Sequence, residues 1–397
     1  MGRMTISKIL VVGFLVLNLI PTVAANSATA ANTPAEDGPR FELYGFVKMD
    51  AIYDLNRMDP EWNSVLRPSQ IPMGGPPYYK DGEVIFSVRP SRIGSRIFLP
   101  MAREDVKLVI EFDLFGTGSN TGHRILRMRH ASAEIGQFLV GQSWSLFTTE
   151  IFAPATLDFW GPNGLLLSRK PQVRWTPFLD DNNRFAVGLE RPSNSVDDGK
   201  VDEIDPDLDV QARYRIPDFT VQWRMMGDWG TFQLAGVVSI LGYEDLLTDG
   251  GEISGEETGF GGNAALIYNI GSKNKILAHY VYGEGVASYF NDGGVDLSGD
   301  GVGSTIAVPI RGWMVYYEHW WSRKVSSTGG YSEVLQDNVG LQTDDAFRRG
   351  SYATVNLVYH LTDRINYGIE GQWAERQDKN LAVGTDRRIA TAVKVSF

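Results

Sequence analysis

Arginine is the residue type whose spacing in this chain could do chemistry. Arg92 and Arg96 lie four positions apart and Arg127 and Arg129 lie two apart, so each pair shares one face of an extended segment. Arg174 stands between two apolar residues in a further segment of the same kind. Guanidinium groups gathered on one wall bind carboxylates and other oxyanions. The pattern predicts an anion-attracting surface, provided that neighbouring strands place these arginines side by side.

Pro90 extends this set by one residue. Proline cannot donate a hydrogen bond to a strand ladder, so it predicts a bulge or kink at this point. A one-residue bulge would bring Arg89 onto the face of Arg92. The predicted lining of a passage is therefore Arg89, Arg92, Arg96, Arg127, Arg129 and Arg174.

The segment 144–168 is too apolar for an ordinary exposed loop. Only Glu150 and Asp158 are charged within it. Folded between strands, it would narrow the enclosed space and place both carboxylates opposite the arginines. The electric field across the passage, between these carboxylates and the arginines, favours solutes with oriented charge. The alternative is an apolar segment that packs on a neighbouring subunit.

Catalysis and metal binding have little support. The chain has no cysteine, its five histidines show no close paired spacing, and Gly141–Ser145 lacks the G-x-S-x-G form. The acidic stretches 197–209 and 291–300 could bind Ca²⁺, but neither has EF-hand spacing. We expect no catalytic residues, no cofactor and no metal site. The formal net charge of −11 argues against a nucleic-acid partner.

Strands must position these residues, because apolar residues alternate with polar ones from Phe41 to the last residue. The alternation is clear in 106–114, 232–240, 365–373 and 389–397. The segments are typically ten or more residues long and carry Trp and Tyr near their ends. These are the features of a transmembrane antiparallel β-barrel, with lipid on one face and water on the other. A closed barrel also satisfies every backbone group without water.

Long and short connections alternate along the chain, as outer loops and periplasmic turns do. The predicted short turns are 100–103, 136, 179–182, 227–230, 271–274, 322–325 and 361–364. The predicted long loops are 55–82, 115–123, 144–168, 192–217, 243–257, 286–310, 337–346 and 377–386. Eight loops and seven turns predict an all-β barrel of about 16 strands, in which 144–168 folds inward as a constriction loop.

The segment 207–216 also alternates, and counting it as a spanning strand would make the number odd. We therefore expect it inside the fourth outer loop, as a local hairpin with 218–226.

The first residues resemble an export signal. Arg3 and Lys8 precede a short apolar run, and small residues follow at positions 23–25. We expect residues 1–25 to be a signal peptide, 26–40 a flexible periplasmic leader and 41–397 the barrel. Cleavage would leave 35 basic and 48 acidic residues, a net charge of −13.

Five short blocks resemble the DcaP-like outer-membrane porins. They are Gly45–Asp50, Ser91–Gly94, Gly141–Ser145, Pro154–Pro162 and Pro171–Thr176. The resemblance covers most of the chain and implies a homotrimer of sixteen-stranded barrels that passes small anions, dicarboxylates among them. It also implies that Arg92, Arg127, Arg129 and Arg174 help to line the passage. The leader has neither the length nor the heptads of the coiled coil that members of this family can carry.

The sequence thus predicts a passive channel in the outer membrane of a Gram-negative bacterium, with a preference for small anionic solutes. Its partners would be outer-membrane lipid and other copies of the chain. One alternative is a plugged structural or adhesive barrel whose acidic outer loops contact other surfaces. A barrel hydrolase is a further alternative.

Overall fold

The computed structural model describes residues 38–73, 82–101, 104–116, 125–197, 199–200, 210–245, 254–299 and 305–397. The expected signal peptide and nearly all of the expected leader lie outside these ranges. The compact unit that carries the strands runs from Arg40 to Phe397. Within the described ranges, no helix is both long and apolar enough to cross a membrane.

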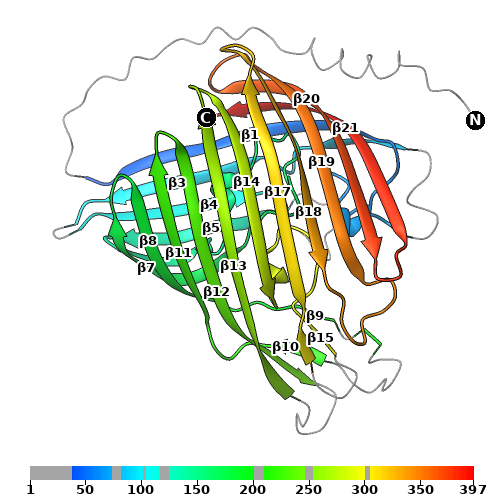
Figure 1. Ribbon diagram of the computed structural model, residues 1–397. Coiled ribbons are helices and arrows are strands. Elements are labelled where there is room, and N and C mark those ends of the chain that lie inside the picture. Colours follow the sequence, from blue (N-terminus) through cyan, green and yellow to red (C-terminus); the bar gives the residue numbers. More distant parts are fainter. Residues whose placement is uncertain are drawn as a thin grey trace, which may run out of the picture. The chain divides into compact units, whose positions relative to one another are not determined.

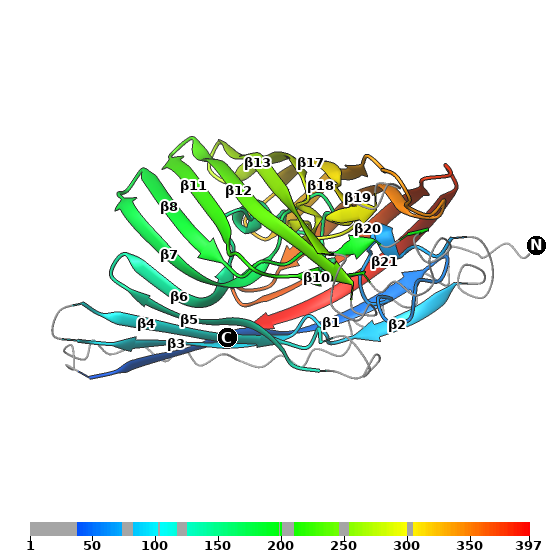
Figure 2. The same cartoon turned by 90° about the horizontal axis from the view of Figure 1, so that it is seen from below.

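Antiparallel strands form a closed ring, which Figure 2 shows from below. The first half of the ring contains β1 (Arg40–Asp54), β2 (Glu83–Ser87), β3 (Arg92–Leu99), β4 (Val106–Asp113), β5 (Arg127–Ile135), β6 (Phe138–Trp144), β7 (Arg169–Leu179), β8 (Asn183–Glu190) and β11 (Asp218–Gly227). The second half contains β12 (Gly230–Asp245), β13 (Ser254–Ile270), β14 (Asn274–Glu284), β17 (Pro309–Trp320), β18 (Val325–Gln336), β19 (Phe347–His360), β20 (Ile365–Asp378) and β21 (Val383–Ser396). β2 and β3 pair one after the other with β1 and together count as one strand of the ring. The ring therefore has the sixteen strands that the sequence predicts.

The ring closes where the last strand meets the first. β21 pairs with β1 from Phe46 opposite Ser396 to Asp54 opposite Arg388. The backbone N–H of Gly45 donates to Phe397 O at 3.2 Å, and Phe397 N–H donates to Gly45 O at 3.1 Å. Phe397 is therefore part of the closing seam.

Three features differ from the predictions. β10 (Val210–Arg213) pairs with β12, not with β11, so the predicted hairpin is wrong. β12 extends beyond the end of β11, and its remaining backbone groups take β10 as their partner. The connection predicted at 377–386 is also shorter, because only residues 379–382 separate β20 from β21. Around Pro90 the chain leaves the sheet over residues 88–91 instead of forming a one-residue bulge.

The turns at the opposite end of the barrel follow the prediction. Gly136 lies at φ +54° between β5 and β6, a left-handed conformation that glycine adopts without strain. Figure 1 shows the elements of the long loops gathered at one end of the barrel, including β9 (Val196–Asp197) and β15 (Leu297–Gly299). β15 pairs with β9 and with β16 (Thr305–Ala307) in a small separate sheet.

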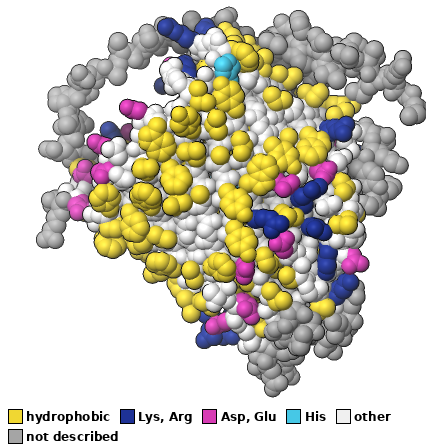
Figure 3. Space-filling model, in the orientation of Figure 1, with side chains coloured by type: hydrophobic (Ala, Val, Ile, Leu, Met, Phe, Trp, Pro, Cys, Tyr) yellow, Lys and Arg dark blue, Asp and Glu magenta, His cyan; other side chains and the backbone are white. Residues whose placement is uncertain are grey.

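The wall is apolar outside and polar inside. In β1, Val47 and Met49 are exposed on the outer face, whereas Lys48, Asp50 and Asp54 are buried on the inner face. Figure 3 shows apolar side chains spread over the outer face of one side of the barrel. This arrangement suits a wall with lipid on one side, because lipid hydrocarbon cannot solvate charged groups.

The inner core lies between the constriction loop (residues 144–168) and the wall from β12 to β18. Phe147 and Leu166 pack with Val281 and Ile310, and Phe152 packs in a second cluster with Met314. The loop also carries the short 3₁₀ helix η2 (Glu150–Phe152). Two further 3₁₀ helices, η1 (Pro68–Gln70) and η3 (Ala287–Tyr289), lie in outer loops. The loop is buried inside the barrel, as its apolar composition predicts.

Candidate functional site: an arginine-lined constriction

Side chains of the wall fix the start of the constriction loop by binding its backbone. Gln222 Nε2 donates to Leu146 O at 2.7 Å, and Gln233 Nε2 donates to Thr148 O at 2.9 Å. Such amide side chains replace the strand partners that the loop lacks. The loop is thereby held against β11 and β12.

Two glutamates of the opposite wall fix the tip of the loop. Glu318 on β17 accepts the N–H of Ala155 at 2.8 Å. Glu370 on β20 accepts the N–H groups of Leu157 at 2.6 Å and Asp158 at 2.9 Å. The loop therefore crosses the barrel, and part of the space that it leaves free lies beside β3 to β7.

A cavity of about 690 Å³ occupies that space. Five arginines line it, namely Arg67, Arg92, Arg127, Arg129 and Arg169. Its other lining residues are Glu111, His130, Trp144, Glu150, Ala153, Phe159, Trp160, Leu167, Phe290 and Asn291. The structure thus gathers Arg92, Arg127 and Arg129 of the predicted set around one cavity.

Two carboxylates of β4 orient three of these arginines. Arg127 Nη2 and Arg129 Nη1 lie 2.7 and 2.8 Å from Asp113 Oδ2. Glu111 Oε1 lies 2.6 Å from Arg129 Nε and 3.5 Å from Arg92 Nε. The pairs hold the guanidinium groups in place, and each guanidinium keeps further N–H donors for another acceptor.

Arg169 and Arg67 complete the cavity and were not predicted. The Arg169 guanidinium lies 4.7 Å from the Trp144 ring centroid and forms no ion pair with any carboxylate in the described ranges. β5 and β6 pair only as far as Ala131 opposite Gln142, whereas Trp144 still pairs with Arg169 across β6 and β7. β5 and β6 diverge beyond the Ala131–Gln142 pair. Trp144 and Arg169 therefore line the cavity, although the alternation along their strands would place both on the outer face.

Arg67 belongs to the first outer loop. Its Nε donates to Asp292 Oδ1 at 2.8 Å, and its guanidinium lies over the rings of Trp62 and Trp160, 4.1 and 5.0 Å from their centroids. Nothing in the spacing of the first loop marks this arginine, because two of its partners, Asp292 and Trp160, come from other loops.

The remaining predicted arginines lie elsewhere. Arg89 Nη1 donates to Glu61 O at 2.8 Å and so binds the first outer loop. Arg96 lies farther toward the short turns, 3.8 Å from Glu42. Arg174 is 9% exposed and donates to Gln172 Oε1 at 3.1 Å. None of these three lines the 690 Å³ cavity.

The two loop carboxylates occupy different surroundings. Glu150 lines the cavity together with the arginines and accepts the Thr148 hydroxyl at 2.7 Å. Asp158 is only 7% exposed, and its Oδ2 accepts the Tyr352 hydroxyl at 3.0 Å and the N–H of Leu66 at 3.3 Å. Asp158 thus ties the loop to β19 and to the first outer loop, which differs from the expected position opposite the arginines.

Burial of Asp158 also changes its protonation. Desolvation, and then repulsion by the Glu370 carboxylate, raise the pKa of Asp158 from 3.8 to about 7.

A second cavity of about 460 Å³ lies around the loop tip. Arg92, Phe159 and Trp160 line both cavities, and Lys48, His360 and Lys394 contribute cationic or titratable groups to the second. Lys48 Nζ donates to Leu157 O at 2.6 Å and lies 2.6 Å from Asp50 Oδ1. The two cavities therefore adjoin at the loop.

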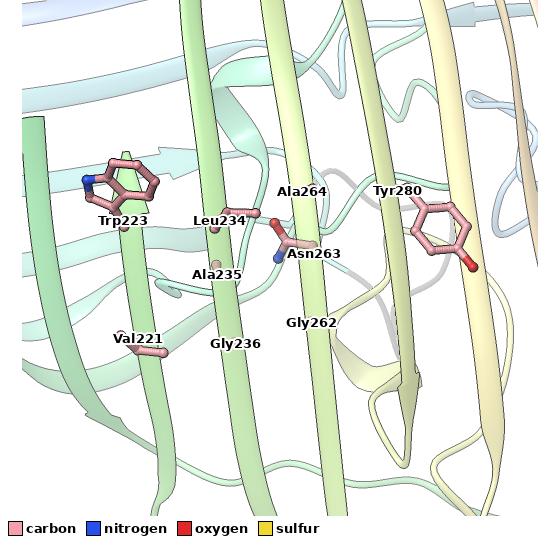
Figure 4. Close-up of a pocket in the computed structure, with 9 residues that line it drawn as sticks. All are labelled: Val221, Trp223, Leu234, Ala235, Gly236, Gly262, Asn263, Ala264 and Tyr280. Atoms are coloured by element: carbon pink, nitrogen blue, oxygen red, sulfur yellow. The ribbon is translucent and has the colours of Figure 1, made fainter. Parts of the chain in front are cut away.

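A groove of about 490 Å³ lies on the outer face of the wall (Figure 4). Trp223 and Tyr280 flank small residues such as Gly236, Gly262 and Ala264 there. Because these side chains point outward, the groove is not part of the lumen.

Carboxylates of the described acidic loop stretches bind protein groups. Asp292 accepts Ser69 N–H at 2.8 Å, and Asp296 accepts Ser195 N–H at 2.8 Å and Ser288 N–H at 3.1 Å. In the described ranges, no group of three or more His, Asp or Glu could hold a metal ion. Most of the acidic stretch 197–209 lies outside the described residues.

The whole barrel is similar to known outer-membrane channels. The outer membrane channel DcaP of Acinetobacter baumannii matches with a TM-score of 0.78 and 22% identity, over 92% of this chain and 100% of that one. An anion-selective porin from Comamonas acidovorans matches with a TM-score of 0.58 and 11% identity, over 90% and 100% of the two chains. The trimer form of OmpT from Vibrio cholerae matches with a TM-score of 0.53 and 13% identity, over 91% and 100%.

These structural likenesses show the fold, and the sequence shows the family. No curated protein matches the chain in sequence. The model of the family described as DcaP outer membrane protein matches residues 16–395, nearly the full length. The chain therefore belongs to the DcaP outer membrane protein family and is a porin of the Gram-negative outer membrane.

Proposed function

We propose that this porin passes small anionic solutes, dicarboxylates among them, in preference to cations. The observation that carries the proposal is Arg169, a cavity-lining guanidinium with no carboxylate partner in the described ranges. A solute carboxylate supplies the missing counter-ion and makes charge-assisted hydrogen bonds there.

The neighbouring arginines favour a solute with more than one carboxylate. Glu111 and Asp113 hold Arg92, Arg127 and Arg129 in fixed positions beside Arg169, and unused N–H donors remain on each guanidinium. Glu150 on the loop repels a carboxylate and so orients it toward the arginines. The aromatic rings of the cavity leave the solute few other polar partners.

We further propose that the mature chain is a homotrimer embedded in outer-membrane lipid. The trimer form of the Vibrio cholerae OmpT barrel supports this assembly. The proposal includes residues 1–25 as a cleaved signal peptide and 26–40 as a periplasmic leader.

Reversal potentials of purified protein in planar bilayers, measured across a KCl gradient, test the selectivity. We expect an anion-selective wild type, and we expect Arg169→Gln to lower that selectivity. Arg311→Gln is the matched control, because Arg311 is an exposed residue near the outer end of β17 and pairs with Asp337 at 2.9 Å. Clear cation selectivity of the wild type would contradict the proposal.

Replacing Arg92, Arg127 and Arg129 together by alanine has a stronger expected effect. The constriction would lose three positive charges, so its preference for anions should fall further than in the single variant. Succinate added to the wild type should reduce the chloride current by competing for the same site. Absence of any conductance in folded protein would instead favour the plugged structural or adhesive barrel.

A further inference from the structure

A second group of arginines lies on the inner wall toward the short turns. Arg184 is the second residue of β8 and is the register partner of Arg224 on β11. Arg174 lies on the neighbouring strand β7, with Gly188 of β8 as its register partner. The three strands are adjacent in the ring (Figure 1). Arg174 lies level with a residue four positions from Arg184 along β8, so the three arginines belong to one stretch of neighbouring strands.

Neutral amides, rather than carboxylates, accept most of the hydrogen bonds of these arginines. Arg184 Nη1 donates to Gln222 Oε1 at 3.4 Å. Arg224 Nε and Nη2 donate to Gln233 Oε1 at 3.1 and 2.7 Å. Arg174 donates to Gln172 Oε1 and to the backbone carbonyl of Trp144. The amides orient the guanidinium groups without neutralising them.

The three arginines carry more positive charge than their ion-pair partner neutralises. Glu150 Oε1 lies 3.9 Å from Arg224 Nη2, and this is the single ion pair that the three arginines form in the described ranges. Arg174 and Arg224 are only 9% and 8% exposed. Like charges on neighbouring strands repel each other, and a buried cation without a partner is costly. A bound anion would relieve both effects.

Glu150 connects this cluster to the constriction. Its side chain lines the 690 Å³ cavity on one side and faces Arg224 on the other. Glu150 therefore lies between the arginines of the constriction and Arg224.

We propose that Arg174, Arg184 and Arg224 form a second anion site, which takes carboxylates or inorganic oxyanions after the constriction. The proposal rests on the proposed function in that the solute is an anion. It adds that passage has two binding steps, separated by Glu150. The site faces the end of the barrel that carries the short turns, so anions added from that end reach it first.

The test of this site is block of the KCl current by succinate, added to one chamber at a time. Protein is always added to the same chamber, and the half-blocking succinate concentration is measured from each chamber. In Arg184→Gln/Arg224→Gln we expect that concentration to rise about tenfold or more from one chamber only, because charge-assisted hydrogen bonds to the blocker are lost. Arg169→Gln should weaken block mainly from the opposite chamber.

Arg311→Gln/Arg349→Gln is the control, since it makes the same chemical change at arginines that pair with Asp337 and Glu375 instead. It should leave block from both chambers unchanged. Slower mobility after heating in SDS gels checks that each variant folds. Unchanged sided block in a folded Arg184→Gln/Arg224→Gln channel overturns the second site. A cation-selective wild type overturns the proposed function instead, so the two failures are distinguishable.

Discussion

Replacing Glu370 by glutamine tests how firmly the constriction loop is held. Glu370 accepts the N–H groups of Leu157 at 2.6 Å and Asp158 at 2.9 Å. Glutamine has one acceptor oxygen, so one backbone N–H loses its partner and the other loses a charged one. The two effects together cost about 2–4 kcal/mol. Because 1.4 kcal/mol corresponds to a factor of ten, the released state of the loop tip should become about 30- to 700-fold more populated.

Single-channel recording measures this population as the fraction of time spent in conductance substates. Glu318→Gln should have a smaller effect, because Glu318 accepts only the N–H of Ala155 from the loop. Glu333→Gln is the control, since Glu333 accepts the Tyr331 and Ser351 hydroxyls at 3.3 and 3.4 Å. Substate occupancy of Glu370→Gln that equals the wild type would refute the idea that these bonds fix the loop.

Three further predictions concern stability. Arg388→Met should destabilise the barrel in denaturant titrations by about 3–5 kcal/mol, because it leaves Asp54 and Asp386, 2.8 and 3.0 Å from the guanidinium, buried without a cationic partner; an unchanged midpoint would contradict this. The pKa of Asp158 is raised to about 7, so the contribution of its protonated form to stability is full below pH 3.8 and is lost as pH rises through 7. Asp158→Asn should therefore remove the decrease in the free energy of unfolding that the wild type shows between pH 4 and 8. Val355→Arg should cost about 2–4 kcal/mol in lipid vesicles, since Val355 is 63% exposed on the outer face near the middle of β19, and a loss of stability only in detergent would argue against lipid contact.

Several site residues could be predicted because their face follows from local periodicity. Arg92, Arg127 and Arg129 lie on regular strands, and alternation places them toward the cavity. The constriction loop could be predicted as well, because an apolar segment between two strands of a barrel must be buried. Composition therefore indicates that the loop is buried.

Other positions depend on partners that lie far away in the chain. Asp158 faces Tyr352 and Leu66 instead of the arginines, because the loop tip reaches β19 and the first outer loop. Arg67 enters the cavity by stacking on Trp62 and Trp160. No spacing rule within a single segment reports contacts of this kind.

The class of fold, the approximate number of strands and the apolar character of the inward loop can all be read from the amino-acid sequence. These follow from alternation and from segment length, which are local properties of the chain. The tertiary structure decided which arginines share a cavity. Arg169 lines this cavity because β5 and β6 diverge beyond Ala131 and Gln142. Arg174 lies outside the cavity, on the strand next to that of Arg184. Register and strand divergence arise only when neighbouring strands pair. They therefore determine where along the lumen each arginine lies.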